Sequence, residues 1–138
     1  MKSENMQVLG VLVLGWLGGC AAGTTAAAPA SEGVTRQVLQ QAPLPGDDEL
    51  RLMLIEYAPG VAAPAHRHPV AGTCYVLDGI AESRYEGEDL QVYRAGDSYQ
   101  DYANRAHAVW RNASESEPLR FLCAAQIKPG EAFAEPIN

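Results

Sequence analysis

Three histidines carry the clearest chemical signal in this chain, and they are the only histidines among its 138 residues. His66 and His68 flank Arg67 in a segment that follows a proline, and His107 lies further along the chain. Because side chains alternate across a β-strand, His66 and His68 are expected to share one face and Arg67 to point away. A closed sheet could bring His107 to the same pocket. Neutral imidazole binds Fe, Mn, Ni, Cu and Zn, so this pattern predicts a site for one divalent transition metal.

The elements that must position these histidines are short β-strands. After residue 35 no helical periodicity is sustained, and apolar or β-branched runs alternate with turn residues. Strands are expected over residues 35–41, 50–58, 65–68, 73–77, 81–86, 90–94, 97–100, 106–111 and 119–127. The Asp78-Gly79 dipeptide between two of them is typical of a tight hairpin. The pattern predicts an all-β fold, a single small barrel or jelly roll.

The N-terminal residues are expected to lie outside this barrel. Lys2 precedes the apolar run of residues 8–19, which is typical of a secretory signal and short for a membrane span. The run ends at Cys20 in a sequence, Leu-Gly-Gly-Cys, that resembles a bacterial lipobox, in which the cysteine is lipidated. The chain therefore divides into a signal peptide at 1–19, a flexible tether at 20–34 and a barrel domain at 35–138.

The expected location is the periplasm, with the lipid on Cys20 attaching the protein to a membrane. Ala21 follows the cysteine, and by resemblance to Gram-negative lipoproteins it favours the outer membrane. Two alternatives stay open for this segment. The general signal peptidase could cut after Ala22 or Ala30 and release a soluble secreted protein, or the apolar run could stay uncleaved as an anchor.

The composition of the chain narrows the classes of molecule that it is expected to bind. The formal net charge of −7 argues against nucleic acid, because phosphate backbones select for Lys and Arg. The 47% hydrophobic fraction is ordinary for a globular protein and argues against a disordered chain. A small-molecule substrate or ligand is the expected partner, and a homodimer formed through the barrel edge is a further alternative.

Two segments around the histidines resemble the motifs of small single-domain cupins. The first covers Gly60-x5-His66-x-His68 and residues 75–79, and the second covers residues 96–98, His107 and residues 111–112. The likeness spans roughly residues 50–127. It implies a cupin β-barrel in which His66, His68 and His107 hold one divalent metal.

The chain departs from the cupin pattern at a ligand position. Cupins usually carry a glutamate ligand four residues after the second histidine, where this chain has Gly72. The usual Pro and Gly before the histidine of the second motif are Tyr102 and Asn104. Without the carboxylate the site would be three neutral imidazoles, which hold a cation less strongly and leave one more coordination position open.

Cys74 is a candidate beyond the histidines. Strand alternation places Gly72 and Cys74 inward and Tyr75 outward. Three interpretations of Cys74 stay open: a small core residue, a disulfide with Cys123, and a soft ligand or reactive thiol.

Asp101 and Tyr102 are the other candidates for catalysis. Asp101 or its neighbour Gln100 could be a polar group beside the metal or a substitute ligand, or both could belong to a solvated turn. Tyr102 belongs to a set of aromatic residues that either line a pocket or pack the core: Tyr57, Tyr99, Tyr102 and Trp110.

Two function classes fit these residues best, and a structural or interaction protein that dimerises through the barrel edge is a third. In the first, the chain is an exported metal-dependent enzyme with dioxygenase-like or related chemistry on a small organic substrate, in which a Tyr, Asp or Cys moves protons. In the alternative, it is a non-catalytic cupin of the cell envelope that binds a small ligand or a metal.

Overall fold

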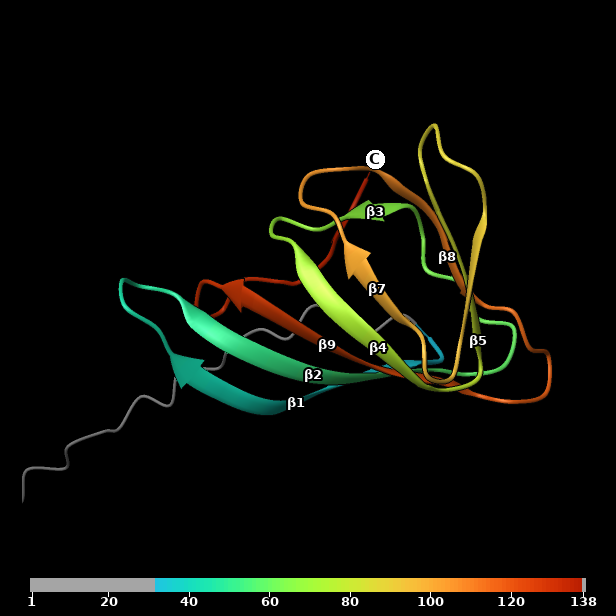
Figure 1. Ribbon diagram of the computed structural model, residues 1–138, viewed down its shortest axis with the longest axis horizontal. Helices are drawn as coiled ribbons and strands as arrows, with labels where there is room; N and C mark the ends of the chain where they lie inside the picture. The colour runs from blue at the N-terminus through green and yellow to red at the C-terminus, as the bar shows by residue number, and fades with distance from the viewer. Residues whose placement is uncertain (1–31, 138) are drawn as a thin grey trace, which may run out of the picture.

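The computed structural model describes residues 32–137, which form ten β-strands and no helix (Figure 1). No helix in this part of the chain is therefore long and apolar enough to cross a membrane. The strands are β1 (Val34–Pro43), β2 (Glu49–Tyr57), β3 (His66–Arg67), β4 (Gly72–Asp78), β5 (Ile80–Tyr85), β6 (Gln91–Arg94), β7 (Ser98–Asp101), β8 (His107–Asn112), β9 (Leu119–Ile127) and β10 (Glu135–Pro136).

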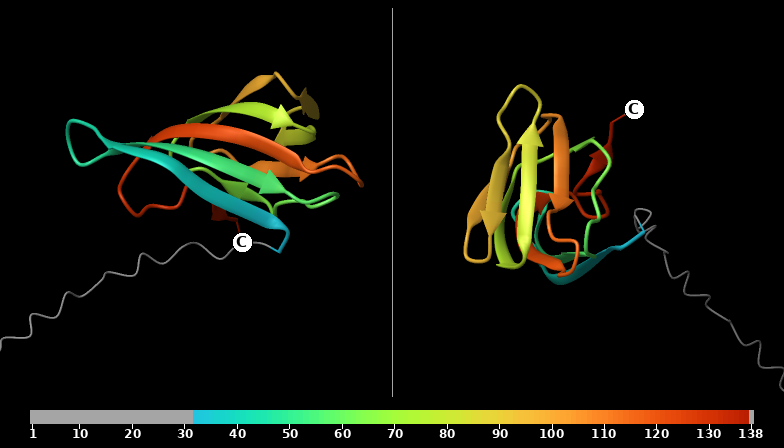
Figure 2. Two further views of the ribbon diagram at one scale, coloured as in Figure 1. Left: turned by 90° about the horizontal axis from the view of Figure 1, so that it is seen from below. Right: turned by 90° about the vertical axis from the view of Figure 1, so that its right-hand side faces the viewer.

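The strands form two five-stranded antiparallel sheets that face each other (Figure 2). One sheet has the order β1-β2-β9-β4-β7 and the other β10-β3-β8-β5-β6. Residues in β2 and β9 alternate between buried and less buried positions, as expected for strands with one face on the core. The expected all-β jelly-roll fold is therefore confirmed.

Each expected strand is present, with ends that differ by at most two residues. The two-residue strand β10 was not expected; its side chains show no alternation that would mark it. It pairs with β3 and so holds the end of the described chain beside His66. The expected signal peptide and most of the expected tether lie outside the described residues, and β1 begins at Val34.

The prediction of a hairpin at Asp78-Gly79 is wrong. The strands on either side of it do not pair, because β4 lies between β9 and β7 while β5 lies between β8 and β6. The dipeptide instead takes the chain from one sheet to the other. Gly79 has a φ of 87°, and a Cβ there would lie 2.5 Å from the carbonyl oxygen of Pro118, so this corner requires glycine.

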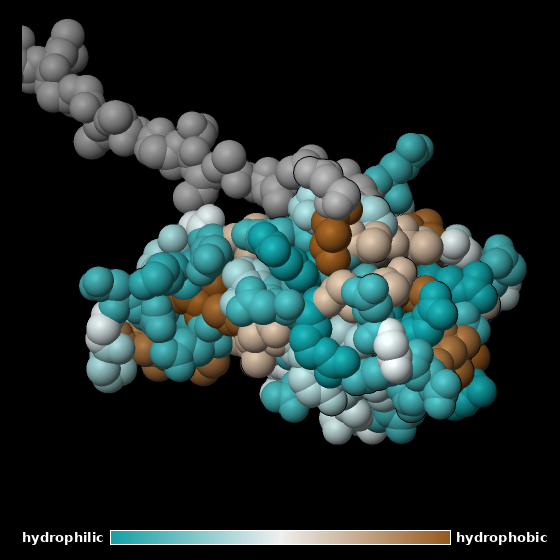
Figure 3. Space-filling model, turned by 90° about the horizontal axis from the view of Figure 1, so that it is seen from above, coloured by the Kyte–Doolittle hydropathy of each residue, from teal (hydrophilic) through white to brown (hydrophobic). Residues whose placement is uncertain are grey.

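Aromatic side chains fill the space between the sheets. Tyr99 lies 4.8 Å from Trp110 between ring centroids, and Trp110 lies 5.1 Å from Phe121 in an edge-on arrangement. Tyr57 packs on Phe121. All four belong to the buried core, so Tyr57, Tyr99 and Trp110 are packing residues. On the face seen in Figure 3, hydrophilic residues predominate and hydrophobic ones form separate small groups.

Candidate metal centre

The three histidines come together at one end of the barrel. His66 lies in β3, His68 follows that strand directly, and His107 is the first residue of β8, paired with His66 across the sheet. Ring nitrogens of the three lie within 4.8 Å of one another. All three side chains are buried, whereas Arg67 is exposed and pairs with Glu135. The alternation expected from the sequence is therefore confirmed.

One ring nitrogen of each imidazole lies within hydrogen-bond distance of a protein oxygen atom, which orients the ring. His66 Nδ1 lies 3.0 Å from the carbonyl oxygen of Pro64, and His68 Nδ1 lies 2.8 Å from that of Phe133. His107 Nε2 lies 2.8 Å from Ser83 Oγ. Such contacts behind the ligands are typical of metal-binding histidines, whose second nitrogen is oriented by a protein partner.

On two of the three rings, the opposite nitrogen has no hydrogen-bond partner. His68 Nε2 and His107 Nδ1 are both buried and unpaired. Buried polar atoms are nearly always satisfied, so these two call for a partner. Burial lowers the pKa of each histidine, and in His107, where the other two histidines add to the effect, the pKa falls to about 3. The rings are therefore neutral at neutral pH, and residue types, spacing and free nitrogens all fit a divalent transition metal.

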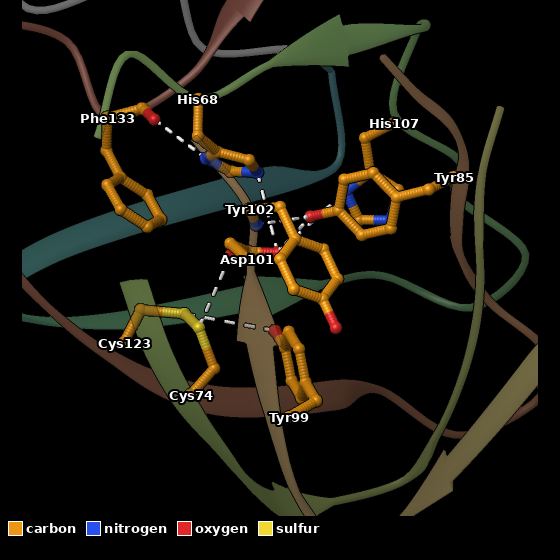
Figure 4. Close-up of a disulfide and its surroundings, with 9 residues drawn as sticks. All are labelled: His68, Cys74, Tyr85, Tyr99, Asp101, Tyr102, His107, Cys123 and Phe133. Atoms are coloured by element: carbon orange, nitrogen blue, oxygen red, sulfur yellow. Dashed lines mark hydrogen bonds and ion pairs between the residues drawn. A yellow bond between two sulfur atoms is a disulfide. The ribbon is translucent and has the colours of Figure 1, made fainter. Parts of the chain in front are cut away.

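Asp101 lies beside the histidines, at the end of β7. Asp101 is 4% exposed, so the alternative of a solvated turn is wrong for this residue, although the neighbouring Gln100 is exposed. Asp101 Oδ1 lies 3.5 Å from His68 Nε2 and 3.9 Å from His107 Nδ1 (Figure 4). Burial raises the pKa of this carboxyl to about 6, against the opposite effect of a hydrogen bond from Tyr85.

Tyr85 and Ser83 were missed at the sequence level. Tyr85 stacks on the ring of His107 at 4.2 Å between centroids, and its hydroxyl donates to Asp101 Oδ1 at 3.1 Å. Ser83 is the group behind His107. Both lie on the inner face of β5, where Ala81, Ser83 and Tyr85 alternate with outward residues. The two-residue period of β5 could have identified both residues as inward-facing.

Tyr102 lies at the edge of this group and is 41% exposed. Its ring contacts that of Tyr85 edge-on at 5.1 Å, and its backbone N–H donates to the Tyr85 hydroxyl. The Tyr102 hydroxyl points away from the histidines in Figure 4. The structure thus places the backbone of this candidate, rather than its hydroxyl, next to the site.

Cys74 and Cys123 are joined in a disulfide. They are direct partners on β4 and β9, and both are 1% exposed. Of the three interpretations open for Cys74, the structure shows the disulfide; neither sulfur is then a free thiol or a thiolate ligand. The bond lies under the site, since Cys74 Sγ is 3.4 Å from Asp101 Oδ2 and the Tyr99 hydroxyl donates to Cys123 Sγ at 3.8 Å (Figure 4).

Phe133 occupies the space beside Gly72, the position at which cupins usually carry a glutamate. A Cβ on Gly72 would lie 2.5 Å from Phe133 Cζ, so no larger side chain fits there while the ring stays in place. The same ring packs on His68 at 4.7 Å between centroids. Arg51 holds this segment by donating to the carbonyl oxygens of Lys128 and Glu131.

The paired sheets and the inward histidines define the chain as a barrel of the cupin type. Residues 53–125 match the cupin domain family, and because this is more than half of the chain, the protein belongs to that family. The resemblance drawn from the two motifs is therefore confirmed. No curated protein matches the chain.

Several solved structures share the fold. An uncharacterized conserved protein with a double-stranded beta-helix domain from Klebsiella pneumoniae has 23% identity and a TM-score of 0.58, covering 78% of this chain and 90% of its own. The polyketide cyclase RemF from Streptomyces resistomycificus has 20% identity and a TM-score of 0.62, covering 80% and 75%. The DMSP lyase DddQ from Ruegeria pomeroyi has 20% identity and a TM-score of 0.61, covering 76% of this chain and 52% of its own.

Proposed function

We propose that this cupin binds one divalent transition metal through His66, His68 and His107 and acts as a metal-dependent enzyme on a small organic substrate. One observation carries the metal site: two buried imidazole nitrogens face a common centre without partners, while each ring is held from behind. Leaving such nitrogens unsatisfied costs about 1–3 kcal/mol each, which a bound cation removes.

Two further observations support an enzyme. A bound metal would supply Lewis acidity toward a carbonyl or carboxylate, or a site for dioxygen chemistry. Beside it, the Tyr85 hydroxyl donates to Asp101 Oδ1, so the chain itself holds an exchangeable proton next to the histidines. Two proteins of the same fold are named as enzymes, a DMSP lyase and a polyketide cyclase.

Metal analysis of the protein purified without a histidine tag tests the site. We expect about one equivalent of Fe, Mn, Ni, Cu or Zn in the wild type, before or after reconstitution, and none in the double variant His66→Ala/His107→Ala. Arg67→Ala is the matched control, because Arg67 lies between His66 and His68 in the sequence and points outward. A wild-type protein that takes up no metal even after reconstitution contradicts the proposal.

A non-catalytic binding protein is the second candidate, and the burial of the site favours it. His66, His68 and His107 are 8%, 4% and 1% exposed, so the histidines themselves offer a substrate little accessible surface. Oxygen consumption and product formation across thiols, phenolics and carboxylates distinguish the two candidates. Turnover that is lost in the double histidine variant supports the enzyme, and a flat response by the metal-loaded protein favours the binder.

We further propose that the protein is exported and carries a lipid on Cys20, a residue outside the described part of the chain. The disulfide between Cys74 and Cys123 supports an oxidising compartment, in which such bonds persist. Labelling of expressing cells with radioactive palmitate should mark the wild type and leave Cys20→Ser unmarked. Equal labelling of both proteins would exclude Cys20 as the attachment site.

A further inference from the structure

The metal site proposed above has three nitrogen ligands, and the structure points to a fourth ligand of a different kind. We propose that Asp101 binds the same metal through Oδ1, so that the carboxylate of the site comes from β7. This inference rests on the proposed metal site and adds to it the ligand that completes its charge and coordination.

The distances around Asp101 fit a shared ion better than hydrogen bonds. Oδ1 is 3.5 Å from His68 Nε2 and 3.9 Å from His107 Nδ1, and both nitrogens lack a hydrogen-bond partner. Two ligand atoms that each lie about 2.1 Å from an ion, at a tetrahedral angle, are about 3.4 Å apart. The separation from His68 Nε2 matches this spacing, and the longer separation from His107 Nδ1 corresponds to a wider angle at the ion.

The alternative role for Asp101, orienting a histidine ligand from behind, does not fit the contacts. The outer nitrogens of the three histidines already have partners: the carbonyl oxygens of Pro64 and Phe133, and Ser83 Oγ. Asp101 faces the inner nitrogens instead. It lies on the side where the metal would bind.

The surroundings of Asp101 fix which oxygen faces the histidines. Oδ2 is turned toward the disulfide, 3.4 Å from Cys74 Sγ, and Oδ1 accepts a hydrogen bond from the Tyr85 hydroxyl at 3.1 Å. Carboxylate ligands are themselves usually hydrogen-bonded, as Asp101 is here. Within residues 32–137 no Lys or Arg pairs with this carboxyl, and the two histidines beside it, His68 and His107, are neutral. A cation at the histidines would compensate this buried negative charge.

The strand register explains how a carboxylate reaches the site without a glutamate on β4. Gly72 on β4 and Asp101 on β7 are direct partners in the sheet, so they lie on the same face. The space above Gly72 is filled by Phe133. The carboxylate thus lies one strand away from the position where cupins usually have it, and Phe133 closes the gap that this leaves.

Metal affinity in Asp101→Asn tests the inference. In competition with a chromophoric chelator for Zn²⁺ and Co²⁺, we expect the variant to bind about a hundredfold more weakly or worse, because even partners behind the ligands contribute 10–100-fold. The visible spectrum of bound Co²⁺ should also change, since the ligand set changes. Asp89→Asn is the control: it removes one exposed carboxylate from the turn between β5 and β6, and its affinity and spectrum should match those of the wild type.

The failure of this inference can be distinguished from failure of the metal site itself. A variant with an unchanged Co²⁺ spectrum, whether or not its affinity falls, overturns the role of Asp101 and leaves the three-histidine site standing. A wild type that binds no metal overturns both.

A measurement on the wild type covers the case in which Asp101→Asn fails to fold. In a crystal structure of the metal-loaded protein, Oδ1 should lie about 2.1 Å from the metal. A separation beyond about 3 Å would mean that Asp101 is not a ligand.

Discussion

Removing the disulfide is expected to lower the free energy of unfolding of this protein by about 4 kcal/mol. Cys74 and Cys123 are 49 residues apart, and closing a loop of that length restricts the unfolded chain by about this amount. The bond joins β4 to β9 directly under Asp101, so its loss also loosens the base of the candidate metal site. Urea unfolding of the double variant Cys74→Ala/Cys123→Ala, compared with the oxidised wild type, measures the difference.

The control for this experiment separates the cross-link from the packing of two buried sulfur atoms. Wild-type protein reduced by a dithiol while unfolded, and refolded under reducing conditions, keeps both side chains and lacks only the bond. It should lose most of the 4 kcal/mol that we expect for the double variant (about 3 kcal/mol or more). An oxidised wild type no more stable than its reduced form would contradict the prediction.

Metal binding is expected to stabilise the fold by a similar amount. A ligand that binds only the native state, at about 1,000 times its Kd, adds about 4 kcal/mol to the free energy of unfolding. For a domain of this size that corresponds to a rise in Tm of about 15–30 °C. Pairing of the metal with the buried nitrogens of His68 and His107 contributes to this affinity and so to the stabilisation. Thermal unfolding with the reconstituting metal and with a chelator measures it.

The variants already described supply the controls for the metal effect. His66→Ala/His107→Ala should unfold at one temperature with metal and with chelator, whereas Arg67→Ala should keep the full difference. An equal rise in the double variant would show that the metal acts elsewhere on the protein. No rise in the wild type would contradict a native metal site.

Alternation along single strands made much of the site predictable from the sequence. The two-residue period correctly placed His66 and His68 on one buried face and turned Arg67 outward. The same period correctly predicted that Cys74 is buried and that Tyr75 is exposed. These predictions worked because inward and outward positions in a half-buried strand depend only on local geometry.

Predictions that depend on which strands are neighbours were less successful. Asp78-Gly79 has the composition of a hairpin, yet β4 and β5 belong to different sheets. For Asp101 the sequence left several interpretations open, from a residue of a solvated turn to a metal ligand. Its burial could not be predicted, because it depends on the pairing of β7 with β4. Phe133 gave no sequence signal at all, since it reaches the site from the segment after β9.

By itself the sequence determined the fold class, the family and the choice of the three histidines as candidate metal ligands. It could do so because strand periodicity, turn residues and motif spacing are local properties of the chain. The tertiary structure decided the rest. It joined Cys74 to Cys123, filled the place beside Gly72 with Phe133, and brought Asp101 and Tyr85 against the histidines. Those contacts join residues far apart in the chain, and they form only when the barrel closes and the strand register places their side chains on one inner face.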